Sequence, residues 1–221
     1  MSELIEYYRK WARDYEEIYH RTDPHRQEEL EMIASAIQSS LRGRVIIDLA
    51  CGTGWWDRIL SETAKSIIGL DINNEVLEIA KGKKYKCPVK FMIGDAFQPH
   101  FSPGSFDGAL ATFWISHIPK KQLHQWIDTL HTLLQPGSRV FLADNMYIPN
   151  LTGPIIEKQG DENKYKHRIL RDGSHHDVLK NYYSRDELVE IFSRHVPQFD
   201  KSNVFQGHCF YWVDYQLTRT I

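Results

Sequence analysis

A glycine-containing loop and two later acidic residues have types and spacing that suit ligand chemistry. The loop is the segment DLACGTG, residues 48–54, which directly follows a short β-branched run. Gly52 and Gly54 allow the backbone to turn tightly and to approach a ligand closely. The helix expected after the loop points its free N–H groups back at it. Asp71 lies about 20 residues further on, the spacing expected of a carboxylate that binds a ribose.

The second acidic residue, Asp95, follows a later strand in the segment Gly94-Asp95-Ala96-Phe97. Its carboxylate can accept a hydrogen bond from an exocyclic adenine amine, and the next backbone N–H can donate to a ring nitrogen. Phe97 can pack on the purine. The loop, Asp71 and Asp95 therefore suit separate parts of one nucleoside.

Alternating strands and helices are expected to position these residues. The apolar pattern predicts strands at 44–48, 66–71, 89–93, 107–113 and 139–144. Helices are predicted at 55–63 and 74–81, followed by one that buries Leu123 to Leu134 and ends at a turn over residues 135–137. This alternation predicts βαβ units and a parallel sheet.

The flanking regions depart from that alternation. Residues 3–20 are predicted to form one helix whose aromatic residues share a face, and Asp23-Pro24 to begin a second helix. A hairpin is predicted around residues 171–174, a capping box at Ser184, and two closing strands near 199–205 and 209–218. We expect a single domain over 1–221, divided into an N-terminal helical lid or cap (1–42), a cofactor-binding core (43–144), an insert with a hairpin (145–183) and a C-terminal helix with closing strands (184–221).

Composition narrows the class of protein and of partner. The formal net charge is −2, so no global basic field exists to hold a nucleic acid. Cys51, Cys87 and Cys209 are widely spaced, which argues against a disulfide framework or a thiolate metal site. The charged N-terminus has no signal-peptide pattern, and no apolar run is long enough for a membrane span. We expect a cytoplasmic enzyme, monomeric or homodimeric, with no membrane or nucleic-acid partner and no metal.

At this point the sequence resembles the class I S-adenosylmethionine-dependent methyltransferases, particularly the small-molecule group with the ubiquinone and menaquinone C-methyltransferases. The matching segments are VIIDLACGTG, GLDINNEVLEIA, FMIGDAF, SFDGALATFWISHIP and LQPGSRVFLAD. They occur in the family's order and spacing. The resemblance implies a Rossmann-like α/β methyltransferase fold, with a mostly parallel seven-stranded sheet, helices on both faces and a terminal antiparallel strand pair.

The resemblance also implies S-adenosyl-L-methionine as cofactor and a role for each motif. Asp48 and the glycine loop would hold the amino-acid end, Asp71 the ribose, and Asp95 with Ala96 the adenine. Ala50 stands where the family often has a glycine. The candidate cofactor-binding residues are Asp48, Ala50, Cys51, Gly52, Gly54, Trp55, Asp71, Ile72, Asp95, Ala96, Phe97, Phe113 and Tyr15.

For each residue that is a candidate for catalysis or for binding the acceptor, a purely structural role is an alternative to the functional one. His117, after the fourth strand, is either a general base or a hydrogen-bonded structural histidine. Tyr15 either reaches the cofactor carboxylate or packs within its helix. Arg168, Arg171 and the pair His175-His176 either meet an anionic acceptor or lie on a solvated hairpin. The remaining candidate substrate-binding residues are Tyr8, Trp11, Trp114 and Asn145.

The predicted function is methyl transfer by in-line displacement to a small organic acceptor, with release of S-adenosylhomocysteine. The motifs of exocyclic amino-nitrogen methylases and of arginine methyltransferases are not found in the sequence. Two alternatives remain open. One is a non-catalytic S-adenosylmethionine-binding regulatory module. The other is a nicotinamide-dependent oxidoreductase, although Trp55-Trp56-Asp57 stands where such enzymes have a third glycine.

Overall fold

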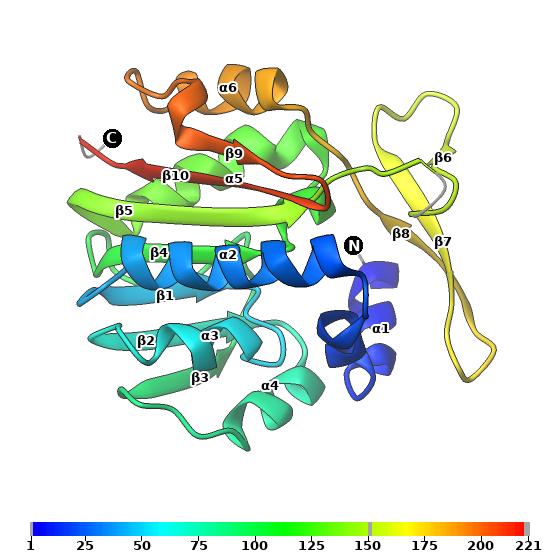
Figure 1. The fold of residues 1–221 in the computed structure, drawn as a ribbon, viewed down its shortest axis with the longest axis horizontal. Coiled ribbons are helices and arrows are strands. Elements are labelled where there is room, and N and C mark those ends of the chain that lie inside the picture. The colour runs from blue at the N-terminus through cyan, green and yellow to red at the C-terminus, as the bar shows by residue number, and fades with distance from the viewer. Residues whose placement is uncertain (1, 150–151, 219–221) are drawn as a thin grey trace.

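A seven-stranded sheet with strand order β3-β2-β1-β4-β5-β10-β9 forms the centre of the molecule (Figure 1). The computed structural model describes residues 2–149 and 152–218. The strands are β1 (Val45–Leu49), β2 (Ser66–Asp71), β3 (Val89–Ile93), β4 (Phe106–Thr112), β5 (Leu134–Asn145), β9 (Val204–Gln206) and β10 (Phe210–Gln216). Strands β1 to β5 pair in parallel, and β10 runs antiparallel to β5 and β9. The predicted Rossmann-like fold, with its terminal antiparallel strands, is confirmed.

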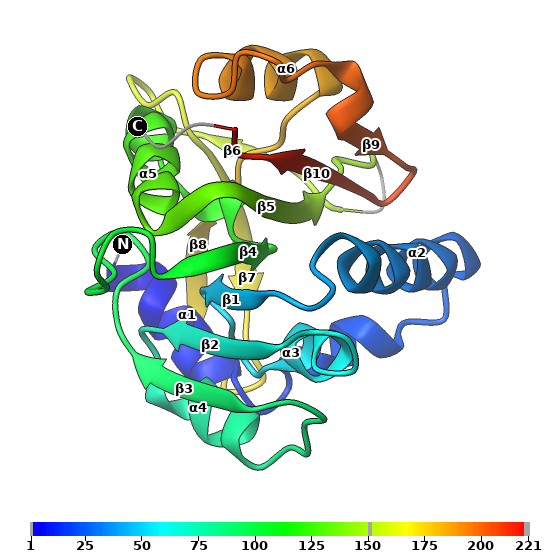
Figure 2. The same ribbon diagram turned by 90° about the vertical axis from the view of Figure 1, so that its left-hand side faces the viewer.

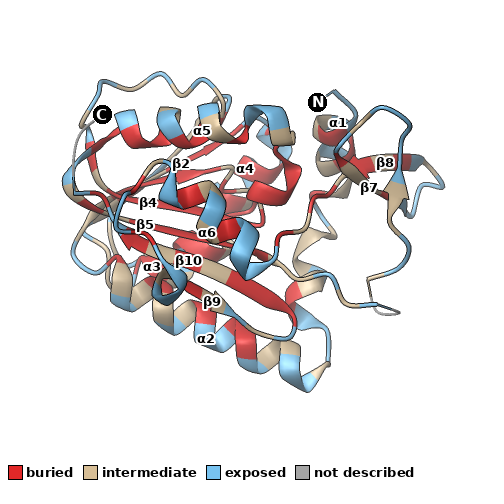
Figure 3. Ribbon diagram, turned by 90° about the horizontal axis from the view of Figure 1, so that it is seen from above, coloured by how far each residue is buried: buried red, intermediate tan, exposed pale blue. Residues whose placement is uncertain are grey.

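Helices cover both faces of this sheet, as predicted (Figure 2). They are α2 (Pro24–Ser40), α3 (Trp55–Leu60), α4 (Asn74–Lys81), α5 (Lys120–Thr132) and α6 (Arg185–Ser193). Apolar residues of α2 and α3 pack in one core cluster, and those of α5 and α6 in another. Burial is concentrated in the sheet and in the helix faces turned toward it (Figure 3).

Local signals in the sequence explain where two of these helices begin. The Asp23 side chain accepts a hydrogen bond from Arg26 N at 2.8 Å, and Pro24 occupies the first turn of α2. Ser184 and Glu187 form the predicted capping box at the start of α6.

The N-terminal segment differs from the prediction of one helix over residues 3–20. Helix α1 (Ser2–Trp11) ends in a turn, and a separate 3₁₀ helix covers Tyr15–His20. The physical reason is packing of the second part into the core. Tyr19 is buried, its ring stacks on Trp55 at a centroid distance of 4.5 Å, and its hydroxyl accepts from Trp56 Nε1 at 3.1 Å. The predicted single helix is therefore wrong, although the ring of Tyr15 contacts those of Trp11 and Tyr19.

The turn predicted at residues 135–137 is also wrong as a boundary, because β5 already begins at Leu134. Leu134 pairs with Phe106 of β4, and the register shifts before Gly108. Gly137 has φ of +85°, so the turn-forming residue is accommodated inside an irregular strand.

A second, three-stranded antiparallel sheet lies near the carboxyl edge of the large sheet (Figure 1). It consists of β6 (Ile156–Glu157), β7 (Lys164–Ile169) and β8 (His175–Leu179), and β7 and β8 form the predicted hairpin. Arg171 in the hairpin turn pairs with Asp14 at 3.1 Å and Glu17 at 2.6 Å. The hairpin is thereby tied to the N-terminal segment, which lies between it and the sheet.

Within the part of the chain that the structure describes, no helix is long and apolar enough to cross a membrane. The three cysteines are free thiols.

Candidate active site

A cavity of about 140 Å³ opens where β1, β2, β3 and β4 end, and helix α1 closes one side of it. It brings together most of the predicted cofactor-binding residues: Tyr15, Ala50, Gly52, Asp71, Ile72, Asp95, Ala96, Phe97 and Phe113. Tyr8, Trp114 and His117, predicted for the acceptor side, also line it. Five further lining residues were not predicted from the sequence, namely Leu4, Ile5, Asn73, Val76 and Thr112.

The loop after β1 has a backbone shape that constrains its residue types. Gly54 has φ of +69°, and a Cβ there would lie 2.7 Å from the Tyr85 hydroxyl. Ala50 and Phe113 have φ of +60° and +58°, which is unusual for residues with a side chain. Both line the cavity. Such strain costs on the order of 1–3 kcal/mol and is commonly found at ligand sites.

Asp71 lies at the end of β2 and is only 9% exposed. One oxygen accepts from Gly52 N and the other from Asn73 N, each at 2.9 Å. Burial raises the pKa of this carboxyl group, and the backbone hydrogen bonds oppose the shift. Each oxygen keeps a lone pair, so the group fits the two hydroxyls of a ribose.

Asp95 lines the cavity near the end of β3, and its side chain is exposed. Its Oδ1 accepts from Phe97 N at 2.8 Å, which leaves Oδ2 for a ligand. The Phe97 ring meets the ring of Trp114 edge to face at 5.6 Å. Trp114 Nε1 is buried and has no hydrogen-bond partner among the described residues. An adenine ring fits this end, because aromatic surface and polar atoms meet there.

Four predicted cofactor residues lie outside the lining of this cavity. Asp48 is buried behind the loop, and neither of its oxygens has a hydrogen-bond partner in the described structure. Burial, and then the Asp57 carboxylate, raises the pKa of Asp48. Because both oxygens are buried, contact between Asp48 and the amino group of an amino-acid moiety requires the loop to move. Cys51 and Gly54 instead shape the loop, since Gly54 N donates to Cys51 O at 3.1 Å. The ring of Trp55 is held by Tyr19.

His117 makes two hydrogen bonds that fix its protonation. Its Nδ1 lies 2.6 Å from the Leu179 carbonyl oxygen, and its Nε2 lies 2.7 Å from the Tyr8 hydroxyl. Because a carbonyl only accepts, Nδ1 carries the hydrogen and Nε2 accepts from Tyr8. Burial, reinforced by the Lys180 charge, lowers the pKa of His117 to about 3. The imidazole is therefore neutral, and its Nε2 is occupied by the Tyr8 hydroxyl.

We expect this neutral histidine to make stability depend on pH. His117 has a pKa of about 3 in the folded state and about 6.5 when unfolded. Between these values the unfolded state binds more protons, so the free energy of unfolding falls as the pH falls from 6.5 toward 3. Urea unfolding at several pH values should show a flatter dependence in His117→Gln, because glutamine does not titrate.

The matched control is His100→Gln, since His100 is exposed and lies outside both the cavity and the core. It should keep the pH dependence of the parent protein. Parallel curves for His117→Gln and the parent would contradict the assignment.

A second cavity, of about 360 Å³, adjoins the first, and Tyr8, Tyr15, Phe113 and His117 line both. Trp11 and Asn145, predicted for the acceptor side, line this second cavity. Its other polar lining residues include Arg21, Arg26, Lys166, Arg168, Lys180 and Tyr182. Of these, only Arg168 was a sequence candidate. The others come from three separated stretches of chain, and no spacing pattern connects them.

Comparison with known proteins agrees with this geometry. Residues 46–137 match a family model described as a methyltransferase domain. A demethylmenaquinone methyltransferase of Lactococcus lactis is 34% identical over 132 residues, covering 57% of this chain and 50% of that protein. An uncharacterized protein of Methanocaldococcus jannaschii is 32% identical over 200 residues, covering 86% of this chain and 74% of that protein. The chain spans about half the length of several curated relatives that it matches.

Among solved structures, one described as the DhpI-SAM-HEP complex superposes with a TM-score of 0.77 at 22% identity. The superposition covers 96% of this chain and 95% of that one, and it shows a shared fold. The fold, the family model and the relatives agree, and the chain belongs to the class I S-adenosylmethionine-dependent methyltransferases.

Proposed function

We propose that this protein transfers a methyl group from S-adenosylmethionine to a small organic acceptor and releases S-adenosylhomocysteine. The observation that carries the proposal is the pair of adjoining cavities at the carboxyl edge of the sheet. The first presents carboxylates and aromatic rings suited to a nucleoside. The second is larger and more polar. The residues common to both, including Tyr8 and His117, lie where donor and acceptor would meet.

In this proposal the sequence motifs act on separate parts of the donor. Asp71 binds the ribose, Asp95 and Ala96 bind the adenine, and Asp48 with the loop binds the amino-acid end. The methyl group of the donor is bonded to a sulfonium sulfur. After transfer, this sulfur is left as a neutral thioether. The protein therefore acts mainly by aligning the acceptor and excluding water.

Tyr8 and His117 offer a path for the proton of a hydroxyl acceptor. A lone pair of the acceptor oxygen forms the bond to the methyl carbon, while the electrons of the breaking C–S bond remain on sulfur. The proton of the acceptor passes to the Tyr8 oxygen as the Tyr8 proton passes to His117 Nε2. With its low pKa, His117 is a poor base for prior deprotonation. It suffices after attack, because the methylated oxygen that still carries its proton is a strong acid.

We propose that α1 acts as a mobile lid, a smaller segment than the N-terminal lid or cap expected over residues 1–42. Leu4 and Tyr7 of α1 pack with Val178 of β8 in a small apolar cluster separate from the two main ones. Tyr19, by contrast, belongs to a main core cluster. Opening of α1 would uncover both cavities without disturbing the sheet.

Two measurements test the proposed function. Calorimetry should show binding of S-adenosylmethionine and S-adenosylhomocysteine at micromolar affinity, with much weaker binding of NAD. Incubation with methyl-labelled donor and metabolite extracts should then label a small molecule. Preferred binding of NAD would refute the donor assignment. Tight donor binding without transfer to any extract component would favour a non-catalytic regulatory module.

A further inference from the structure

The second cavity has a strong excess of positive charge. Five cationic side chains line it: Arg21, Arg26, Lys166, Arg168 and Lys180. The one carboxylate among its lining residues is Asp23, which is already engaged as the N-cap of α2. The cations come from two stretches far apart in the sequence, residues 21–26 and residues 166–180, which the fold brings together.

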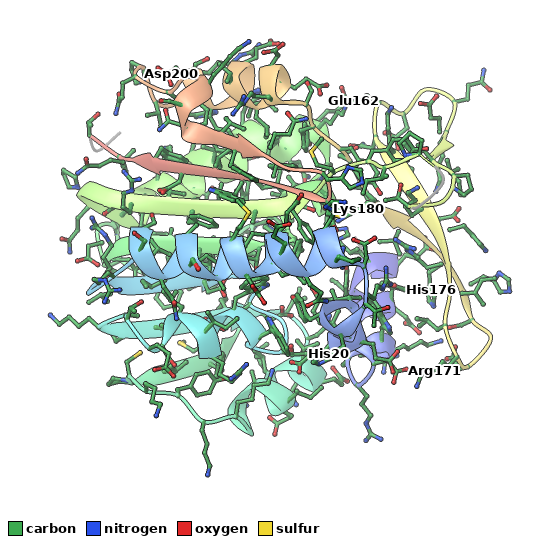
Figure 4. The ribbon with its side chains drawn as sticks, viewed as in Figure 1. His20, Glu162, Arg171, His176, Lys180 and Asp200 are labelled. Carbon is green, nitrogen blue, oxygen red and sulfur yellow. The ribbon has the colours of Figure 1, made fainter. Side chains whose placement is uncertain are left out.

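The two lysines are fixed in place by the protein. Lys166 is buried, and its ammonium group donates to the carbonyl oxygens of Gly153 and Pro154, the latter at 3.0 Å. Lys180 is buried between Ser116 Oγ at 2.7 Å and Asp144 Oδ1 at 3.0 Å. Figure 4 shows Lys180 between the carboxyl edge of the sheet and the hairpin. Such anchored ammonium groups are oriented before a ligand arrives.

The positive charge is little compensated from within. Of the five cations, Lys180 has an acidic partner within 4.0 Å, and the other four have none across residues 2–149 and 152–218. Arg26 Nε donates a hydrogen bond to the Ile18 carbonyl oxygen at 3.2 Å, and its guanidinium carbon lies 4.7 Å from the centroid of the Phe210 ring. Burial, and then the charge of Arg168, lowers the pKa of Lys166 to about 8. A negatively charged ligand would relieve this mutual repulsion.

We propose that the acceptor carries a compact oxyanion, such as a phosphate, phosphonate or carboxylate, that is bound by Lys166, Arg168 and Lys180. The inference rests on the proposed function, because it concerns the acceptor half of the same site. The second cavity binds the anionic end, and the reacting atom of the acceptor lies toward Tyr8 and His117, where the cavities join. Arginine and lysine suit an oxyanion because both donate several charge-assisted hydrogen bonds.

The test measures oxyanion binding and donor-site binding separately. Inorganic phosphate is titrated into the full chain by ³¹P NMR, with and without saturating S-adenosylhomocysteine, and acetate and glycerol are compared in competition. Phosphate should bind in both conditions, and glycerol should not displace it. The relative affinities of phosphate and acetate show whether the site prefers a phosphate-type group or a carboxylate. Failure of both anions to bind would overturn the proposal.

Variants identify the site. Arg168→Gln changes an exposed side chain, so the protein should fold, and its phosphate affinity should fall at least fivefold. Lys166→Met should act in the same direction. The matched control is Arg194→Gln just after α6, an exposed arginine outside both cavities, and it should bind phosphate like the parent. An equal loss in the control would overturn the proposal.

The donor itself carries a carboxylate, and binding of that group is the rival explanation for the cations. Phosphate binding in the presence of S-adenosylhomocysteine, with unchanged S-adenosylhomocysteine affinity in Arg168→Gln, supports an acceptor subsite. Abolition of phosphate binding by S-adenosylhomocysteine, with weaker S-adenosylhomocysteine binding in the variant, assigns the cations to the donor and overturns the proposal. If the parent protein does not bind S-adenosylhomocysteine, the proposed function is refuted instead. The phosphate titration in the absence of S-adenosylhomocysteine then still tests the oxyanion site.

Discussion

Replacing Asp71 with alanine should weaken S-adenosylhomocysteine binding by about 2 kcal/mol or more, which is roughly a 30-fold loss of affinity. Each Asp71 oxygen accepts one backbone N–H and has a further lone pair for a ribose hydroxyl. Charge-assisted hydrogen bonds contribute roughly 1.5–3 kcal/mol each. The substitution also removes the acceptors of Gly52 N and Asn73 N, so the loop loses its anchor. Calorimetry measures the affinity, and circular dichroism verifies the fold.

Asp71→Asn should also bind poorly, although an amide keeps one acceptor oxygen. The carboxylate receives one backbone N–H on each oxygen, so an amide would turn its NH₂ group toward either Gly52 N or Asn73 N. The matched control is Asp186→Ala, because Asp186 is an exposed carboxylate on α6 outside both cavities. Parent-like affinity in a folded Asp71→Ala protein would place the ribose partner elsewhere.

Replacing Lys180 with methionine should lower the free energy of unfolding by about 3–5 kcal/mol, the usual cost of leaving a buried charge without its partner. Asp144, at 0% exposure, accepts from Lys180, from Ser116 N and from Asn145 N. Nearby positive charge, first that of Lys180, holds the pKa of Asp144 below its usual value against the opposing effect of burial. Urea unfolding followed by fluorescence measures the loss.

A double variant and a surface pair serve as controls. Lys180→Met combined with Asp144→Asn should recover part of the stability, because the neutral amide no longer needs a cation. Lys201→Met removes a lysine that pairs with Asp186 at 2.7 Å, but both side chains are exposed, so its effect should be much smaller. If Lys180→Met and Lys201→Met lower the free energy of unfolding equally, the buried pair contributes no more to stability than the exposed pair.

The core of the fold was predictable because local and long-range signals agree there. Predicted strands at 66–71 and 89–93 and the helix at 74–81 match β2, β3 and α4 to the residue. Each is a short apolar or amphipathic run bounded by turn residues; β2 and α4 are buried by their neighbours, and β3 forms the partly exposed edge of the sheet. The acidic residues at strand ends then reach one edge automatically, because parallel strands share their direction.

The N-terminal segment and the second cavity were harder to predict for a physical reason. The aromatic spacing from Tyr8 to Tyr19 suits one helix, but the stacking of Tyr19 on Trp55 favours a break that no proline or glycine marks. The pairing of Asp144 with Lys180 joins residues far apart in sequence through the fold alone. Tertiary contacts decide both features, and a single sequence contains no periodic signal for them.

The acidic groups of the first cavity and the cationic groups of the second cavity are encoded in separate stretches of the chain. The donor cavity takes its acidic and loop residues from positions 50–97, whereas the cations of the second cavity come from positions 21–26 and 166–180. Mutations in the flanking stretches can therefore accumulate without altering the nucleoside contacts. Descendants of one ancestral gene could acquire new acceptors by drift and selection in these stretches while inheriting the same methyl-donor machinery unchanged.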